Sequence, residues 1–238
     1  MAKSLEGNWR PELLFVLRQE MESYQTMQTK IAECDQQLQR HYETMEAKAD
    51  PKLLSKVPRD KRAHGNIPAG FDLREELYRA TGVDLTAIDG INVLTVQTRI
   101  AEVGSDMSRF ASEGHFVSYL DLAPRNKIRG GKVVGREKDK RKSRAGLALR
   151  LAAGTLLESD TYLGAQYRRL RTKLGAPKAR KAMANKLARI AYRMLKYGEK
   201  YVDKGKEFYE QKYRQLQIRM LTKKATELGL QLVQSARV

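Results

Sequence analysis

The sequence predicts a mainly α-helical protein in which a long N-terminal helix precedes a helical C-terminal domain. Apolar residues recur every seven positions between residues 11 and 48. Basic and apolar residues alternate at helical spacing over 178–202 and 205–227. The alternation of period two that marks strands is nearly absent, and a hairpin near Ile128–Val134 is the one β candidate.

The N-terminal helix is predicted over residues 11–48, because Pro11 suits a first helical turn. Its recurring apolar residues are Leu17, Tyr24, Ile31, Leu38 and Met45. Such a seam is typical of a coiled coil or a helical hairpin. A second copy of the chain and a later helix of the same chain both remain open as its partner, and we expect a homo-oligomer.

Three parts follow along the chain. Residues 1–49 form the predicted coiled-coil helix, which Asp50 and Pro51 terminate. Residues 50–71 are rich in proline, glycine and basic side chains and indicate a linker, either laid along a phosphate backbone or simply solvated. Residues 72–238 form the helical C-terminal domain.

Short helices open this domain and longer ones close it. The predicted ranges are 73–80, 84–89, 95–103, 109–122, 145–158, 160–173, 178–202 and 205–227. Gly82 and Gly104 are expected to end the first and third of these. The segment 109–122 is assigned to helix on an aromatic stripe of Phe110, Phe116 and Tyr119.

The charge of the chain points to a polyanionic partner. Lys and Arg number 46 against 28 Asp and Glu, which gives a formal net charge of +18. Nucleic acid is the favoured polyanion because the charge is clustered. An anionic membrane surface and a merely soluble basic protein are the alternatives.

The composition also argues against several other classes of protein. No apolar run approaches the roughly 18–20 residues that span a bilayer, and no signal peptide opens the chain, so we expect a cytoplasmic protein. The single cysteine, Cys34, excludes an internal disulfide and a cysteine zinc site. The three histidines show no metal-ligand spacing, and no catalytic triad or nucleotide-binding loop is visible, so we expect no metal and no cofactor in this chain.

Residues 85–97 resemble a helix-hairpin-helix, in which a Gly-x-Gly turn brings backbone N–H groups close to a phosphate. Gly90 and Ile91 fill the first two turn positions, and Asn92 stands where the second glycine would be. Asn tolerates positive φ better than most residues, so the turn is expected to persist with a weaker anion site. A purely structural helix pair is the alternative.

Residues 125–144 are the most basic stretch of the chain and contain glycines that let a backbone lie against a polyanion. A solvated charge run is the plain alternative. With the turn above, the predicted nucleic-acid contacts are Gly90, Ile91, Asn92, Arg125, Lys127, Arg129, Gly130, Gly131, Lys132, Arg136, Lys140, Arg141, Lys142 and Arg144.

Several blocks together resemble the Piv-type transposases and invertases of insertion sequences, the DEDD recombinases that an RNA can guide. The blocks are Gly7–Phe15 (GNWRPELLF), Gly82–Gly90 (GVDLTAIDG), Gly104–Phe110 (GSDMSRF), Tyr119–Pro124 (YLDLAP), Ala148–Ala153 (ALRLAA), Leu187–Ile190 (LARI) and Lys196–Val202 (KYGEKYV). This resemblance implies a coiled coil followed by a C-terminal transposase domain. It also implies DNA as a partner and a structured guide RNA as a second one.

Two departures from the family pattern bear on catalysis. The family carries an N-terminal RuvC-like domain whose carboxylates bind Mg²⁺, and the chain is expected to lack it because Met1 stands just before the first block. The family's nucleophilic serine precedes paired glycines, and Arg129 occupies that position in Lys127–Gly131 (KIRGG). Ser143 lies in the same stretch but does not match the nucleophile.

The sequence therefore predicts a DNA-binding protein of insertion-element transposition, a transposase fragment that does not cut DNA by itself. A nuclease-free scaffold for structured RNA is the alternative function. A decayed gene remnant is the third reading.

Overall fold

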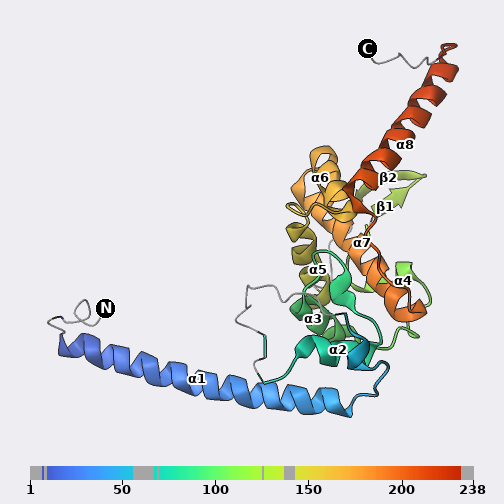
Figure 1. The fold of residues 1–238 in the computed structure, drawn as a ribbon. Helices are drawn as coiled ribbons and strands as arrows, with labels where there is room; N and C mark the ends of the chain where they lie inside the picture. The colour runs from blue at the N-terminus through green and yellow to red at the C-terminus, as the bar shows by residue number, and fades with distance from the viewer. Residues whose placement is uncertain are drawn as a thin grey trace. The chain divides into compact units, whose positions relative to one another are not determined.

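The computed structural model describes residues 7, 10–55, 67–68, 70–124, 126–136 and 143–231, and only the backbone of Val133 and Arg136. The structure is mainly helical, as predicted, with one two-stranded sheet in the described part (Figure 1). The chain divides into two compact units, residues 1–80 and 81–238. The three-part division at residues 49 and 71 stays a prediction.

The first unit is built on α1 (Pro11–Thr44), with the 3-10 turn η2 (Pro51–Leu53) and most of α2 (Leu73–Thr81). The long N-terminal helix is confirmed. Its C-terminal end is fixed by Arg79, which donates to the carbonyl groups of Tyr42 and Met45, the latter at 3.0 Å. Tyr42 is the buried residue of α1, and its ring lies 6.3 Å from that of Phe71.

The predicted seam of α1 is exposed in this single chain. Leu17, Tyr24 and Ile31 expose 64%, 59% and 53% of their surface. The apolar stripe therefore exists as predicted, but no described element covers it over these positions, and the coiled coil remains a prediction.

The second unit contains the remaining elements. They are η3 (Leu85–Ala87), α3 (Val93–Val103), α4 (Glu113–Tyr119), β1 (Asn126–Arg129), β2 (Lys132–Arg136), α5 (Arg144–Thr155), α6 (Tyr162–Leu174), α7 (Ala176–Tyr197) and α8 (Gly205–Glu227). The helix α7 is central and packs against α4, α5 and α6, while α3 packs on α5 and α8 on α6.

Small side chains on α7 let its neighbours approach closely. Its buried residues are Ala179, Met183, Ala184, Leu187, Ala188, Ala191, Tyr192 and Met194. Tyr192 and Phe116 are fully buried, with ring centroids 5.7 Å apart, and the Tyr192 hydroxyl donates to the Phe110 carbonyl at 2.9 Å. The periodicity read over 178–202 thus marks the core of this unit.

Glycine allows the closest backbone approach in this unit. A Cβ added at Gly146 in α5 would lie 2.1 Å from the carbonyl oxygen of Leu120. The chain therefore passes the same point of the core before β1 and again at the start of α5, and no larger residue fits there.

The helices predicted over 11–48, 145–158 and 178–202 end earlier than expected, at Thr44, Thr155 and Tyr197. Two other predicted helices are much shorter than expected. The segment 109–122 is helical only over Glu113–Tyr119, because the Ser112 side chain caps the helix and the carboxylate of Asp106 holds a turn by accepting from the N–H of Ser108. The predicted helix 84–89 is a single 3-10 turn that Asp84 caps. The residues of α8 are all exposed or half-buried, so its predicted amphipathic face is not part of the core.

Candidate nucleic-acid interface

The hairpin predicted near Ile128–Val134 is present and carries part of the predicted interface. Strands β1 and β2 are antiparallel, and Arg129 pairs with Lys132 across the turn. Gly130 and Gly131 form this turn with φ of 53° and 74°. Positive φ at both central residues defines a type I′ turn, whose twist matches that of the strands it joins. The paired glycines thus set the geometry that places two cations side by side at the tip.

The side chains of this hairpin are exposed. Lys127, Arg129 and Lys132 all face solvent, and Ile128 and Val134 expose 67% and 61% of their surface. The strands pack chiefly on each other rather than on a helix of the unit. A lone two-stranded ribbon is marginally stable in water, so an exposed apolar and cationic ribbon of this kind is typical of a surface that binds a partner.

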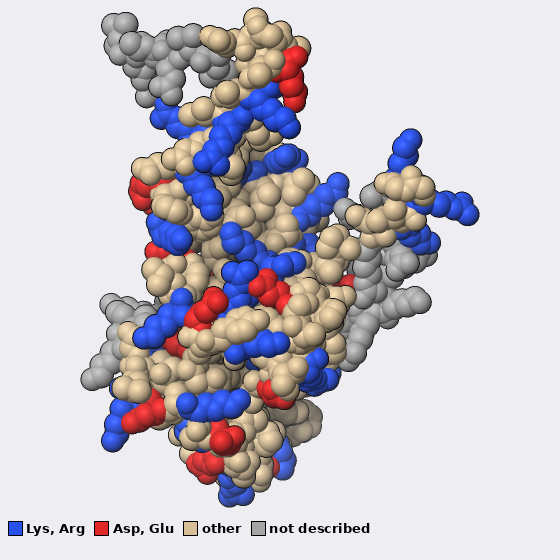
Figure 2. Space-filling model, turned by 90° about the vertical axis from the view of Figure 1, so that its right-hand side faces the viewer, with Lys and Arg blue, Asp and Glu red and all other residues tan. Residues whose placement is uncertain are grey.

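The three hairpin cations lack ion-pair partners within the described part of the chain. None of Lys127, Arg129 and Lys132 forms an ion pair with a described carboxylate. Lys and Arg also predominate over Asp and Glu on the face shown in Figure 2. A polyanion could therefore bind these cations without first displacing a carboxylate of the described residues.

The remaining residues of the basic stretch are placed only in part. Arg144 is exposed at the first turn of α5, and Gly130 and Gly131 have open space around them. Arg136 contributes its backbone to β2. Arg125, Lys140, Arg141 and Lys142 lie outside the described residues.

The Gly90–Asn92 turn differs from the expected anion site. Gly90 has φ of 81°, but Asn92 is extended, with φ of −99°, and its side chain caps α3 by accepting from Thr95. Ile91 is buried, and its N–H donates to the carbonyl of Ile88 at 3.0 Å. The expectation of a positive φ at Asn92 is wrong, because the side chain is used as a helix cap.

Ser143 has a structural place. Its hydroxyl accepts from the N–H of Gly146 at 2.9 Å, which caps α5, and donates to the carboxylate of Glu102 at 3.2 Å. Glu102 also accepts from the N–H of Ala145, and Ser143 is only 4% exposed. Ser143 therefore joins the start of α5 to α3.

Glu113 and Asp121 are both engaged with arginines. Glu113 accepts from Arg189 and Arg193, and Asp121 pairs with Arg150 at 3.1 Å. Burial raises the pKa of Glu113, but the two arginines outweigh it and leave that pKa below its ordinary value. Among the described residues, no three His, Cys, Asp or Glu side chains gather closely enough to hold a metal ion. None of the helices in the described ranges is long and apolar enough to cross a membrane.

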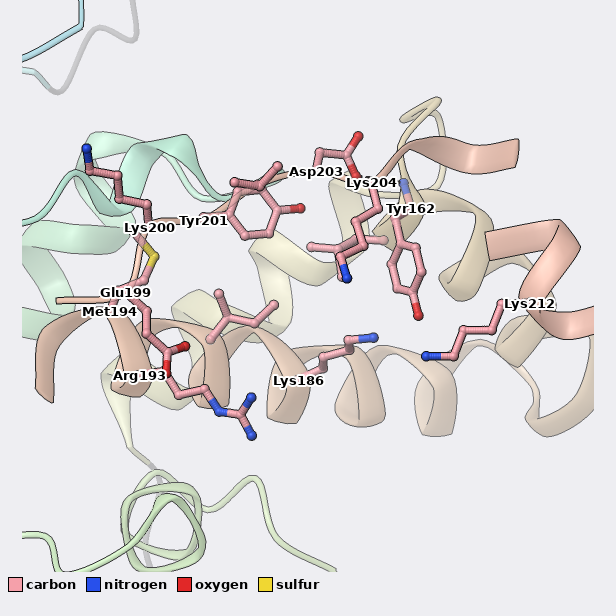
Figure 3. Close-up of a pocket in the computed structure, with 13 residues that line it drawn as sticks. Tyr162, Lys186, Arg193, Met194, Glu199, Lys200, Tyr201, Asp203, Lys204 and Lys212 are labelled. Carbon is pink, nitrogen blue, oxygen red and sulfur yellow. Dashed lines mark hydrogen bonds between the residues drawn. The ribbon is translucent and has the colours of Figure 1, made fainter. Parts of the chain in front are cut away.

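Reasoning from the sequence missed a second group of cations, around a cleft between α6, α7 and α8 (Figure 3). Lys186 and Lys212 belong to it, on different helices. Lys186 is one of the basic residues of the alternating pattern over 178–202, yet it is half-buried. The cluster depends on how the helices pack, so the sequence held no local signal for it.

Comparison with protein-family models gives a match over part of the chain. No curated protein matches the chain. Residues 84–168 match the model of the transposase IS116/IS110/IS902 family, a stretch that runs from η3 into α6 and contains the hairpin and α5. The match supports the transposase family that the sequence predicts, and residues 84–168 identify the chain as similar to the transposases of the IS116/IS110/IS902 group.

Proposed function

We propose that this chain is a DNA-binding protein of insertion-element transposition, with the β1–β2 hairpin as its main described contact with phosphates. The observation that carries the proposal is the group of Lys127, Arg129 and Lys132, three exposed cations without a carboxylate partner among the described residues, inside the stretch that matches the transposase family.

The chemistry of the hairpin suits duplex DNA. Exposed Lys and Arg side chains neutralise phosphates and release the counterions condensed on them. The strands of a ribbon lie about 4.8 Å apart, and the major groove, about 12 Å wide, admits a two-stranded ribbon. The Gly130–Gly131 tip adds no side chain that would hold the backbone away from the DNA.

A salt titration tests this proposal. The affinity for duplex DNA should fall with salt, with a slope in log–log form of about −0.9 for each phosphate neutralised. Replacing Lys127, Arg129 and Lys132 together by alanine should flatten the slope by about two to three units. The loss should be similar for unrelated DNA sequences, because phosphate contacts carry no sequence information.

A matched control removes the same charge elsewhere. Arg171, Lys173 and Lys178 are exposed near the junction of α6 and α7. Their triple alanine variant should change the slope by less than one unit. Equal effects of the two triple variants would mean that only net charge matters and would overturn the assignment to the hairpin. Structured RNA titrated in parallel tests the alternative scaffold function, which tighter binding to RNA than to DNA would favour.

We further propose that the chain binds DNA without cutting it. Arg129 occupies the position of the family's serine, and a guanidinium stays protonated and is no nucleophile. In this proposal Arg129 serves as one more phosphate contact.

Assembly through α1 is also part of the proposed function. Its exposed stripe of Leu17, Tyr24 and Ile31 has the seven-residue spacing of a coiled-coil seam. Pairing with α1 of a second copy would bury that stripe and bring two hairpins to one DNA. Two element ends could then be held by one dimer.

A further inference from the structure

The cleft of Figure 3 lies within the second unit. It is formed by the first turn of α6, the middle of α7, the segment that joins α7 to α8, and the start of α8, and it has a volume of about 440 Å³. Its cationic lining residues are Lys186, Arg193, Lys200, Lys204 and Lys212, against the carboxylates of Glu199 and Asp203. The excess of positive charge favours an anion in this space.

Neither carboxylate of the lining forms an ion pair with Lys186 or Lys212 among the described residues. Asp203 accepts from the backbone N–H of Tyr162 at 3.1 Å. Arg193 is engaged with Glu113 outside the cleft. Lys186 donates to the amide oxygen of Gln166, and Lys212 forms no ion pair with a described carboxylate.

Two ammonium groups and a hydroxyl converge in the cleft. Figure 3 shows the side chains of Lys186 and Lys212 pointing toward one another, with the Tyr162 hydroxyl directed at the space between them. Lys186 Nζ lies 4.7 Å from the centre of the Tyr162 ring, which fixes the ring beside the two charges. Burial, and then the charge of Lys212, lower the pKa of Lys186. A bound anion would relieve both effects.

The cleft is preformed by contacts of its wall. Tyr201 donates to the carboxylate of Asp89 at 2.8 Å, which ties the segment between α7 and α8 to the turn after η3. Tyr209 of α8 packs edge-on against Tyr162 of α6, with ring centroids 5.1 Å apart. The donors are thus held in position before a ligand arrives, which lowers the entropic cost of binding.

We propose that this cleft binds a phosphate group through Lys186, Lys212 and the Tyr162 hydroxyl, as a second anion site separate from the hairpin. Three donors from three helices suit the tetrahedral oxygens of a phosphate better than the planar pair of a carboxylate. The phosphate could belong to a nucleic-acid backbone or to a free polyphosphate. The site does not depend on the function proposed for the hairpin.

The test uses the full chain and the variants Lys186→Gln and Lys212→Gln, alone and combined. Tripolyphosphate is the probe for a free ligand, and the melting temperature is the readout. The salt slope on duplex DNA and on structured RNA is the readout for a backbone phosphate. Lys173→Gln, an exposed change on α6 outside the cleft, is the matched control.

Either of two results supports the proposal. A free-phosphate site predicts that tripolyphosphate raises the melting temperature of the wild type and of Lys173→Gln but not of the double variant. A backbone-phosphate site predicts that the double variant flattens the nucleic-acid salt slope by about one unit. The single variant Lys212→Gln should lose at least half of the tripolyphosphate response or of the change in salt slope. Because Lys212 is exposed, this result would not be explained by a folding defect, as one at half-buried Lys186 could be.

The proposal is overturned if tripolyphosphate stabilises the wild type and the double variant equally, or not at all, while both proteins keep the same salt slope. The triple alanine variant of the hairpin distinguishes a failure of this site from a failure of the proposed function. It should lose DNA affinity and retain the response to tripolyphosphate, so one site can fail without the other.

Discussion

Replacing Arg99 by methionine should stabilise the second unit. Arg99 lies on α3 and is only 3% exposed, with its Nε and Nη1 atoms buried and without a hydrogen-bond partner. Its Nη2 contacts the sulfur of Met107 at 3.1 Å, and the guanidinium lies 5.8 Å from the centre of the Phe116 ring. No described carboxylate compensates the charge. Methionine keeps the aliphatic stem and removes the buried cation.

The size of the effect follows from the cost of burying that charge. Burial lowers the pKa of Arg99 to about 10. That value lies well below the pKa of an ordinary arginine, so holding the charge in the core costs on the order of 3 kcal/mol at neutral pH. The variant loses the contacts with sulfur and ring, about 1 kcal/mol, and leaves a small void, about another 1 kcal/mol. A net gain of about 1 kcal/mol remains, which corresponds to a rise of about 2–4 °C in melting temperature.

Urea unfolding at several pH values measures this gain. The penalty on the wild type is fully present below the folded pKa of about 10 and is relieved as the pH rises through it. The advantage of Arg99→Met should therefore be constant from pH 6 to 9. Arg109→Met is the control, because Arg109 is exposed on the segment after α3, and its change should stay within about 0.5 kcal/mol. A loss of 1 kcal/mol or more in Arg99→Met would refute the reasoning, since it would mean that the guanidinium has a stabilising partner.

Three further predictions concern chemistry, assembly and the surface of α7. The purified chain with Mg²⁺ or Mn²⁺ should give no nicked or covalently attached end-labelled DNA on a denaturing gel, and the same holds for its Arg129→Ser variant. A covalent protein–DNA band that Ser143→Ala abolishes would instead identify Ser143 as a nucleophile. We expect the chain to sediment as an oligomer, and Leu17→Lys with Ile31→Lys should convert it to monomer in sedimentation velocity, whereas Gln25→Lys, at a polar position of α1, should not. A monomeric wild type, or an unchanged oligomer in the double variant, would exclude assembly through the α1 seam. Glu113→Gln should lower the free energy of unfolding at pH 7, because Glu113 holds Arg189 and Arg193. Since the folded pKa of Glu113 is depressed, its contribution is present above the pKa of the unfolded carboxyl and is lost as the pH falls through the folded value. The two proteins should converge in acid, and a difference that persists there would point to packing rather than charge.

The elements that could be predicted are those set by local signals. Gly82 and Gly104 follow the ends of helices, as predicted. The hairpin predicted near Ile128–Val134 is also present, with Gly130 and Gly131 at its turn. The helix predicted over 109–122 is too long, because its aromatic stripe is compatible with a turn followed by a shorter helix. Phe110 precedes α4 and packs edge-on against Phe116 and Tyr119. Spacing alone does not distinguish these two uses of an aromatic residue.

For the candidate sites too, the sequence reveals residues that are neighbours along the chain but not those that are brought together by packing. The hairpin cations are neighbours in sequence, so a charge run was enough to find them. Lys186 and Lys212 meet only because α6 packs on both α7 and α8. The pattern of α7 correctly separated its buried alanines from its basic face, but it could not show that one lysine of that face is covered by another helix.

The close approach of Gly146 to Leu120 has a consequence for how the segment between them can vary. Because the chain leaves the core and returns to it at one point, the two ends of the intervening segment are joined by the fold itself. Doubling the length of such a loop costs only about 0.6 kcal/mol. The segment can therefore be lengthened, shortened or exchanged with little change to the packing of α3, α5 and α7. The corresponding segment of a transposase of the IS116/IS110/IS902 group, grafted between Leu122 and Ser143, should leave the melting temperature nearly unchanged.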